Sequence, residues 1–258
     1  MLINSTYRTY IRNYPSLYFR RPDSSSPFSQ SSSSSSSWGE SSSSSWGESS
    51  SSSYPFGIPF SDSFNDGVLH EWWTFVDNDG IGGTSWTEAS GTLDIDAGGA
   101  DIWFPPDDEY ASMYIGPVSG DWEAITKITY QEATNPWVKS GIMVKNDIEL
   151  QGVAGGYAIV GITPGNDFIF QWDNNGDGYL EESVHNVGAT TYPCWLKLKR
   201  VTNNIAGSYS TNGTDWNAIG NITFGGASIG SSVDVGLYVG GVTLDVLSLT
   251  KFDSFSIS

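Results

Sequence analysis

The stretch that decides the fold spans residues 195–220 and reads WLKLKRVTNNIAGSYSTNGTDWNAIG. Leu196 and Leu198 alternate with lysines, and a period of two is typical of a strand with one buried face and one solvated face. The asparagines at 203–204 tolerate a positive φ, and a second alternating run follows them with Ile205, Gly207 and Tyr209 on one face. Asn-Gly at 212–213 is a strong hairpin signal. These features predict a meander of three antiparallel strands.

The same pattern extends from Phe60 to the last residue, 258. Short runs rich in β-branched and aromatic residues, such as 125–130 and 142–144, alternate with clusters of turn-forming residues, such as 77–80. No segment has a helical periodicity over ten residues. The pattern predicts an all-β sandwich of two antiparallel sheets.

Several short motifs occur in order along this part of the chain. They are SDSFNDG at 61–67 with Trp-Trp at 72–73, GDWE at 120–123, SGIMVK at 140–145, WLKLKR at 195–200, SYSTNGTDW at 208–216, VGLY at 235–238 and FDSFSI at 252–257. Together they resemble the concanavalin-A-like domain known as DUF1349 and found at the C-terminus of some β-xylosidases. The resemblance implies a jelly-roll sandwich over about residues 60–258. Such domains occur both as enzyme appendages and as stand-alone proteins, so the resemblance implies a fold and not one activity.

The charge and the cysteine content exclude several classes of protein. The chain has 258 residues and a net charge of −18, which disfavours nucleic acid as a partner because phosphates repel such a surface. A single cysteine, Cys194, excludes an intrachain disulfide framework. No apolar run approaches the length of a membrane span. The start of the chain lacks the pattern of a secretion signal. Export by another route, a place in a virion and a different precursor start are all left open, and we expect an extracellular or virion-surface location.

The first 59 residues differ from the rest of the chain. Residues 1–23 carry four arginines against one acid and alternate like a half-buried strand, whereas residues 24–59 are a serine-rich, low-complexity linker. An isolated strand leaves its backbone groups unpaired, so this arm needs a partner. We predict that it adds to the sheet edge of a neighbouring copy, drawn there by the opposite charge. The residues expected to carry this contact are Ile3, Tyr7, Arg8, Ile11, Arg12 and Tyr14.

The head-to-tail contact predicted for the arm does not close on itself, so it would generate a filament. The leading hypothesis is therefore a non-enzymatic structural subunit of an extracellular or virion fibre, a homopolymer of this chain. The arm and the long linker are the features that motivate this hypothesis. Loss of polymerisation on deletion of residues 1–23 is its test.

The sharpest local motif is DNNGDGYLEE at residues 173–182. Oxygen ligands at loop positions 1, 3, 5, 7 and 9 with glycine at position 6 are typical of a calcium loop. The expected ligands are Asp173, Asn175, Asp177, the carbonyl of Tyr179, and Glu181. Position 12 is Val184 where a calcium loop has glutamate, and a polar hairpin turn is the alternative. The resemblance also implies that the first and last strands lie together, so Asp62 and Asp253 are a second candidate pair for a cation, with two solvated acids as the alternative.

Carbohydrate binding is the alternative function. Flat aromatic side chains suit sugar rings, and the candidate platforms are Trp86, Trp103, Trp122, Trp137 and Trp172, most of which we expect in the core. His70 and His185 lie in no recognisable catalytic motif, so we expect no enzyme activity. A carbohydrate-binding module and an accessory domain of a glycoside hydrolase system both stay open. Three N-glycosylation sequons occur, at Asn4, Asn212 and Asn221.

Overall fold

The computed structural model describes residues 59–103, 105–225 and 228–258. All regular elements in these residues are β-strands. They are β1 (Phe60–Asp62), β2 (Thr74–Asp77), β3 (Ser85–Ala89), β4 (Thr92–Ala97), β5 (Ala111–Ser119), β6 (Trp122–Gln131), β7 (Lys139–Lys145), β8 (Ala158–Thr163), β9 (Asp167–Trp172), β10 (Glu182–Val187), β11 (Cys194–Val201), β12 (Asn204–Ser210), β13 (Asn217–Thr223), β14 (Ser232–Gly240) and β15 (Ser248–Ile257).

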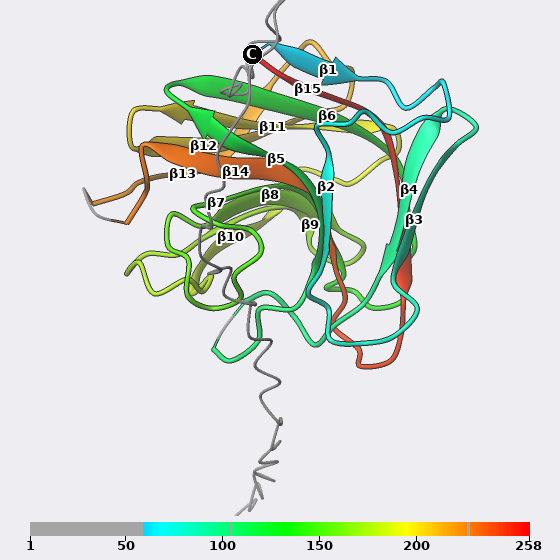
Figure 1. The fold of residues 1–258 in the computed structure, drawn as a ribbon, viewed down its shortest axis with the longest axis horizontal. Helices are drawn as coiled ribbons and strands as arrows, with labels where there is room; N and C mark the ends of the chain where they lie inside the picture. Colours follow the sequence, from blue (N-terminus) through cyan, green and yellow to red (C-terminus); the bar gives the residue numbers. More distant parts are fainter. Residues whose placement is uncertain (1–58, 104, 226–227) are drawn as a thin grey trace, which may run out of the picture. The chain divides into compact units, whose positions relative to one another are not determined.

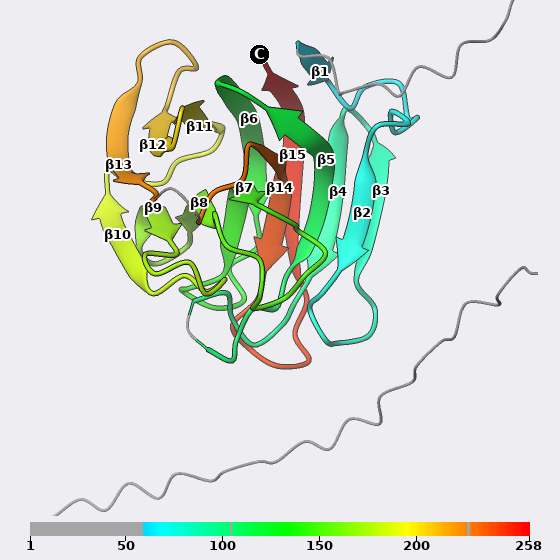
Figure 2. The same ribbon diagram turned by 60° about the vertical axis from the view of Figure 1, so that its left-hand side comes forward.

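The strands form two antiparallel sheets that face each other (Figure 1 and Figure 2). The first sheet has the order β13-β12-β11-β6-β15-β4-β3, with β1 paired to β15. The second sheet has the order β10-β9-β8-β7-β14-β5-β2. Neighbouring strands in each sheet are distant in sequence at several points, as in a jelly roll. The predicted concanavalin-A-like sandwich is confirmed for the described residues.

The stretch at 195–220 forms β11, β12 and β13, as its alternation predicts. Leu196 and Leu198 are fully buried, whereas Lys199 is exposed. The first turn differs in detail, because the positive φ of 55° belongs to Thr202 and not to the asparagines that follow it. The Thr202 N–H donates to Asp121 Oδ1 at 2.6 Å, and this bond helps to hold the left-handed conformation.

The main core fills the space between the two sheets. Strands of the first sheet supply one inward-facing residue in two, as on β4 and β11. The core includes Leu93, Ile95, Ile128, Leu198, Phe252 and Phe255 from the first sheet and Ile142, Val160, Phe170, Val235 and Leu237 from the second. Burial of these side chains supplies most of the hydrophobic stabilisation of the fold.

A second apolar cluster lies on the opposite face of the second sheet. It includes Tyr110, Met143, Tyr157, Ile159, Ile169, Leu180 and Tyr238. Strands β7 and β8 are buried at every position, because both of their faces are covered. Segments between strands, including 98–110 and 146–157, contribute residues to this cover, and the first of them also lines the site described below.

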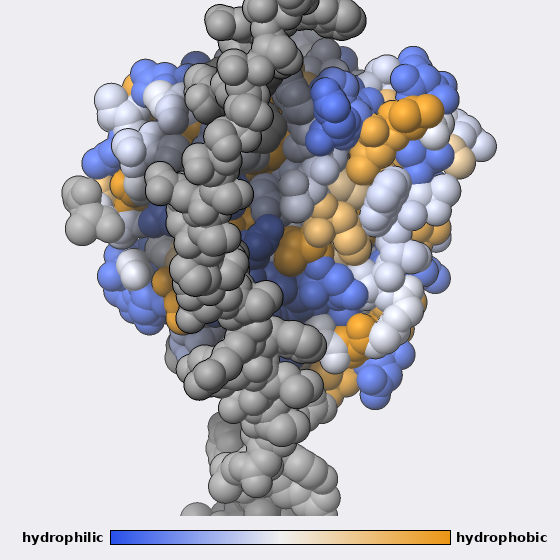
Figure 3. Space-filling view, viewed as in Figure 1, coloured by the Kyte–Doolittle hydropathy of each residue, from blue (hydrophilic) through white to orange (hydrophobic). Residues whose placement is uncertain are grey.

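The exposed surface carries scattered apolar side chains. On the coloured part of the face in Figure 3, hydrophobic side chains gather over β2 and are interspersed with hydrophilic ones. Single exposed apolar residues are normal on a folded protein and need no ligand. In the described part of the chain, no helix is long and apolar enough to cross a membrane.

Candidate functional site

A pocket of about 190 Å³ opens beside the second apolar cluster. Strands β7, β9 and β10 of the second sheet supply part of its lining, and the segments that follow β4, β6 and β14 supply the rest. The lining residues are Asp101, Trp103, Trp137, Lys139, Gln171, Ser183, His185 and Val242. The pocket therefore combines residues from six separate parts of the chain.

Two exposed tryptophans contribute flat apolar surface to the pocket. Trp103 is 47% exposed and Trp137 is 36% exposed. The Trp137 ring meets the His185 ring edge to face, with 5.5 Å between their centroids. The backbone N–H of Trp137 donates to Asn135 Oδ1 at 2.9 Å, and the Asn135 amide donates to Thr243 Oγ1. These hydrogen bonds hold the turn that carries Trp137, and the His185 ring packs against its indole.

The polar part of the pocket contains a buried ion pair. The Lys139 ammonium donates to Asp101 Oδ1, which also accepts the Ile102 N–H. Burial lowers the pKa of Lys139 below its usual value, and the Asp101 carboxylate opposes this shift. Because Asp101 neutralises Lys139, the ion pair presents little net charge to a ligand.

Gln171 supplies an amide to the same pocket. The residue is only 3% exposed, and its Oε1 has no hydrogen-bond partner among the described residues. An unsatisfied buried amide oxygen costs free energy, and a ligand hydroxyl would remove that cost. Gln171 pairs with Ser183 on the neighbouring strand, so the Ser183 side chain lies on the same face of the sheet.

A second ion pair anchors two segments that cover the outer face of the second sheet, and one of them lines the pocket. Lys145 Nζ lies 2.7 Å from Asp108 Oδ2, and it also donates to the Leu150 carbonyl. Asp108 Oδ2 accepts the Gly152 N–H at 2.7 Å. One carboxylate thus ties both the 98–110 and the 146–157 segments to β7. Burial lowers the pKa of Lys145, while Asp108 opposes the change.

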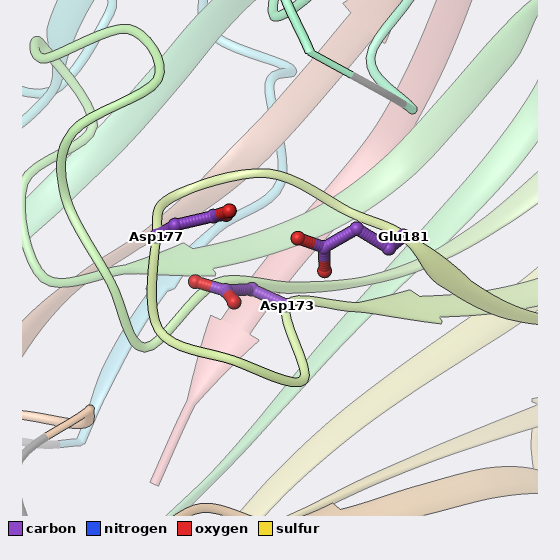
Figure 4. Close-up of side chains that lie close together, drawn as sticks. All are labelled: Asp173, Asp177 and Glu181. Carbon is purple, nitrogen blue, oxygen red and sulfur yellow. The ribbon is translucent and has the colours of Figure 1, made fainter.

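The predicted calcium loop brings three carboxylates together. Ligand atoms of Asp173, Asp177 and Glu181 all lie within 4.8 Å of one another, and Figure 4 shows these side chains at the mouth of the loop between β9 and β10. Such an oxygen-only set suits calcium. The Asn175 side-chain amide donates to Asp177 Oδ2 at 3.0 Å and to Glu181 Oε1 at 2.9 Å.

Three backbone N–H groups of the loop donate hydrogen bonds to the Asp173 carboxylate. Its Oδ1 accepts the N–H groups of Asn175 and Gly176, and its Oδ2 accepts that of Gly178. Burial nevertheless raises the pKa of Asp173. Tyr179 donates its N–H to Asp177 Oδ1. The three predicted carboxylate ligands therefore converge, whereas Asn175 turns its amide nitrogen and not its oxygen toward them, and calcium binding itself stays a prediction.

The other predicted sites have different outcomes. The arm residues and the Asn4 sequon lie outside the described residues. Asn212 and Asn221 are both exposed. Strands β1 and β15 do pair, but Asp62 accepts the Trp73 Nε1–H and Asp253 pairs with Lys127, so the structure does not support a cation shared by the two acids.

The tryptophan platforms also separate into groups. Trp122 is in the core and Trp172 packs partly against it, but the expectation that most of the five lie in the core is wrong, because the other three are exposed. Trp86 is exposed on β3, away from the pocket, and only Trp103 and Trp137 of the five line it. The sequence analysis did not identify Asp101, Lys139, Gln171 or Ser183, because their strands and loops carry no motif for them.

Comparison with known proteins shows similarity of fold. No family model matches the chain, and no curated protein matches its sequence. A Bacteroides ovatus structure described as xyloglucan PUL GH43B has a TM-score of 0.58 at 14% identity, covering 78% of this chain and 39% of that one. The xylan β-1,4-xylosidase of Bacillus halodurans C-125 has a TM-score of 0.55 at 16% identity, covering 80% and 40%.

A functionally unknown protein from Saccharomyces cerevisiae is also similar, with a TM-score of 0.54 at 15% identity over 72% of this chain and 96% of that one. The chain thus spans about two fifths of the two GH43 chains and nearly all of the yeast chain. At these identities the similarity establishes the β-sandwich fold. Membership of DUF1349 stays a prediction.

Proposed function

We propose that this sandwich binds carbohydrate in the pocket that Trp103 and Trp137 line, without catalysing a reaction. The observation that carries the proposal is the pocket itself, in which two exposed indoles accompany a buried amide oxygen without a partner. Indole faces pack on the C–H faces of sugar rings, and the amide and hydroxyl groups are of the kind that bind sugar hydroxyls.

The character of the pocket favours binding over hydrolysis. Glycoside hydrolysis generally uses two carboxyl groups that flank the scissile bond. Among the described residues that line the pocket, Asp101 is the single carboxylate, and it pairs with Lys139. This arrangement supplies neither a second acid nor a free nucleophile.

The GH43 proteins of similar fold support a carbohydrate-related role in a general way. Two of them are described in terms of xyloglucan and xylan. The chain matches about two fifths of each of these proteins, so the similarity concerns their sandwich part. The comparisons give no support to the fibre subunit predicted from the arm and linker, which lie outside the described residues.

A glycan array probed with the full-length chain tests the proposal. We expect binding to at least one immobilised glycan, its loss in Trp137→Ala, and its retention in Trp86→Ala. Trp86 is a matched control because it is exposed to a similar degree, 38%, and lies outside the pocket. Absence of glycan binding by the folded chain, or equal binding by the two variants, would contradict the proposal.

A further inference from the structure

The size of the pocket limits what it can hold. Its volume is about 190 Å³, whereas pockets for drug-sized ligands enclose roughly 300–1,000 Å³. A polysaccharide that ran through the site would need room for several rings and an exit at each end. The volume instead suits one sugar ring, with the rest of the chain outside.

The polar groups of the pocket favour a ligand that donates hydrogen bonds. Gln171 Oε1 is a buried acceptor without a partner among the described residues, and a ligand hydroxyl reaches it once the amide turns toward the pocket that Gln171 lines. Asp101 uses its Oδ1 for Lys139 and Ile102, and its Oδ2 is the second acceptor atom that this residue brings to the pocket. Sugar hydroxyls can supply both donors. A carboxylate or sulfate group can supply neither, because each is an acceptor at neutral pH.

The charges of the pocket and of the whole chain also favour a neutral ligand. Lys139 is the cation in the pocket, and its charge is balanced by Asp101. The chain as a whole carries −18, so an anionic ligand meets a repulsive field before it reaches the site. A neutral ligand avoids this repulsion.

We propose that the pocket recognises a single neutral pyranose at the end of a glycan chain, held between indole faces and bonded through its hydroxyls to Gln171 and Asp101. This inference rests on the proposed carbohydrate binding and specifies its ligand. The pocket thus discriminates by the identity of the terminal residue and not by the length of the chain. Uronic acids and sulfated sugars keep hydroxyl donors, but their charge meets the repulsive field of the chain, so they bind more weakly.

Competition experiments with the full-length chain test this inference. After a glycan array has identified the bound glycans, the methyl glycoside of their terminal residue competes against the intact oligosaccharide, with the corresponding uronic acid glycoside as the matched charged probe. We expect the neutral methyl glycoside and the oligosaccharide to inhibit at concentrations within about threefold of each other, since each fills the same pocket with one ring. The charged probe should inhibit at least about tenfold more weakly.

A variant with a similar volume tests the hydrogen bond. Gln171→Met keeps the length of the side chain but removes the amide, and we expect about tenfold weaker binding, the equivalent of about one hydrogen bond. Its thermal melting curve shows whether the fold is intact, and the Trp137→Ala variant serves as a second probe of the pocket if Gln171→Met unfolds.

The outcomes separate the two proposals. Affinity that rises more than about tenfold from one sugar residue to three, or a preference for the uronic acid, would overturn end recognition and leave carbohydrate binding intact. Failure of the folded chain to bind any glycan would overturn both proposals.

Discussion

Lys145 Nζ lies 2.7 Å from Asp108 Oδ2, and both side chains are sealed from solvent on the outer face of the second sheet. The lysine also sits 4.6 Å from the centroid of the Tyr157 ring. A buried charge is tolerated only when it is paired, so each partner depends on the other. Through this pair the fold joins the 98–110 segment, which lines the pocket, to the 146–157 segment and to β7.

Removal of Lys145 should destabilise the protein strongly. Lys145→Met leaves Asp108 buried without its counter-ion, and we expect the free energy of unfolding to fall by about 3–5 kcal/mol. Urea unfolding followed by tryptophan fluorescence measures the change. The double variant Lys145→Met/Asp108→Leu should recover much of the loss, since no unpaired charge is left.

The surface pair Lys127–Asp253 provides the control for this experiment. Its atoms are 2.9 Å apart, but its side chains are 26% and 36% exposed. Lys127→Met should cost only about 0–1 kcal/mol, because solvent screens the pair. Equal losses for the Lys127 and Lys145 variants would show that burial does not control the strength of these pairs.

Asp234 should make stability depend on pH. Burial raises the pKa of Asp234 from 3.8 to about 6, although the Ile148 N–H donates to it. The folded protein therefore holds this proton more tightly than the unfolded protein does. The contribution of Asp234 to the free energy of unfolding should fall as pH rises from 3.8 to about 6, and it should stay constant above that.

The Asp234→Asn variant isolates this effect, because asparagine keeps an acceptor oxygen for Ile148 and has no proton to lose. Relative to the unchanged protein, the variant should be more stable at pH 7 than at pH 4.5. After allowance for solvent screening we expect the relative gain to be about 1 kcal/mol. Denaturant unfolding across this range gives the difference, and a difference that does not vary with pH would contradict the assignment to Asp234.

Calcium should stabilise the chain through the loop at residues 173–181. A cation would offset the repulsion among Asp173, Asp177 and Glu181 once the Asn175 amide turns its oxygen toward them. At a hundredfold excess over the Kd the gain is about 2.7 kcal/mol. Thermal melting with calcium, with EDTA and with magnesium at equal ionic strength measures it.

Glu181→Gln is the matched variant for the calcium experiment. It keeps the size of the side chain and removes one of the three charges, so the calcium-dependent rise in Tm should shrink markedly. An equal rise in both proteins would place the ion elsewhere, and no rise in the unchanged protein would favour the polar-turn alternative.

Deletion of residues 1–23 tests the predicted assembly arm. If the arm adds to a neighbouring sandwich, the full chain should form filaments at high concentration and the deleted chain should stay monomeric with an unchanged Tm. Negative-stain images and light scattering distinguish the two states. Filaments that persist after the deletion would end the fibre hypothesis.

The alternation of residues predicted much of the first sheet correctly. It placed Leu196 and Leu198 inside, and it placed Ile205 and Tyr209 on one face. Tyr209 stacks on Phe168 of the other sheet, with ring centroids 4.1 Å apart. These strands have one face in the core and one toward solvent, so a period of two appears directly in their sequence. The predicted pairing of first and last strands is also confirmed by the register of Phe60 with Ile257.

The pocket could not be predicted in the same way. Strand β7 reads KSGIMVK and is buried at all seven positions, so alternation does not reveal which face Lys139 and Lys145 occupy. In the sequence, a lysine at each end of a strand is typical of a solvated position. In the structure, the segments that carry Asp101 and Asp108 cover both lysines and pair with them. A buried salt bridge of this kind joins residues 37 or 38 positions apart in the chain.

The sequence by itself determined the β class, the alternating faces of the first sheet and the composition of the acidic loop, because these depend on neighbours within a few residues. Only the tertiary structure decided that Trp103 and Trp137 line one pocket with Gln171, while Trp122 is in the core. The contacts on the outer face of the second sheet depend on how distant segments pack over it. Patterns among neighbouring residues in the sequence do not predict that packing.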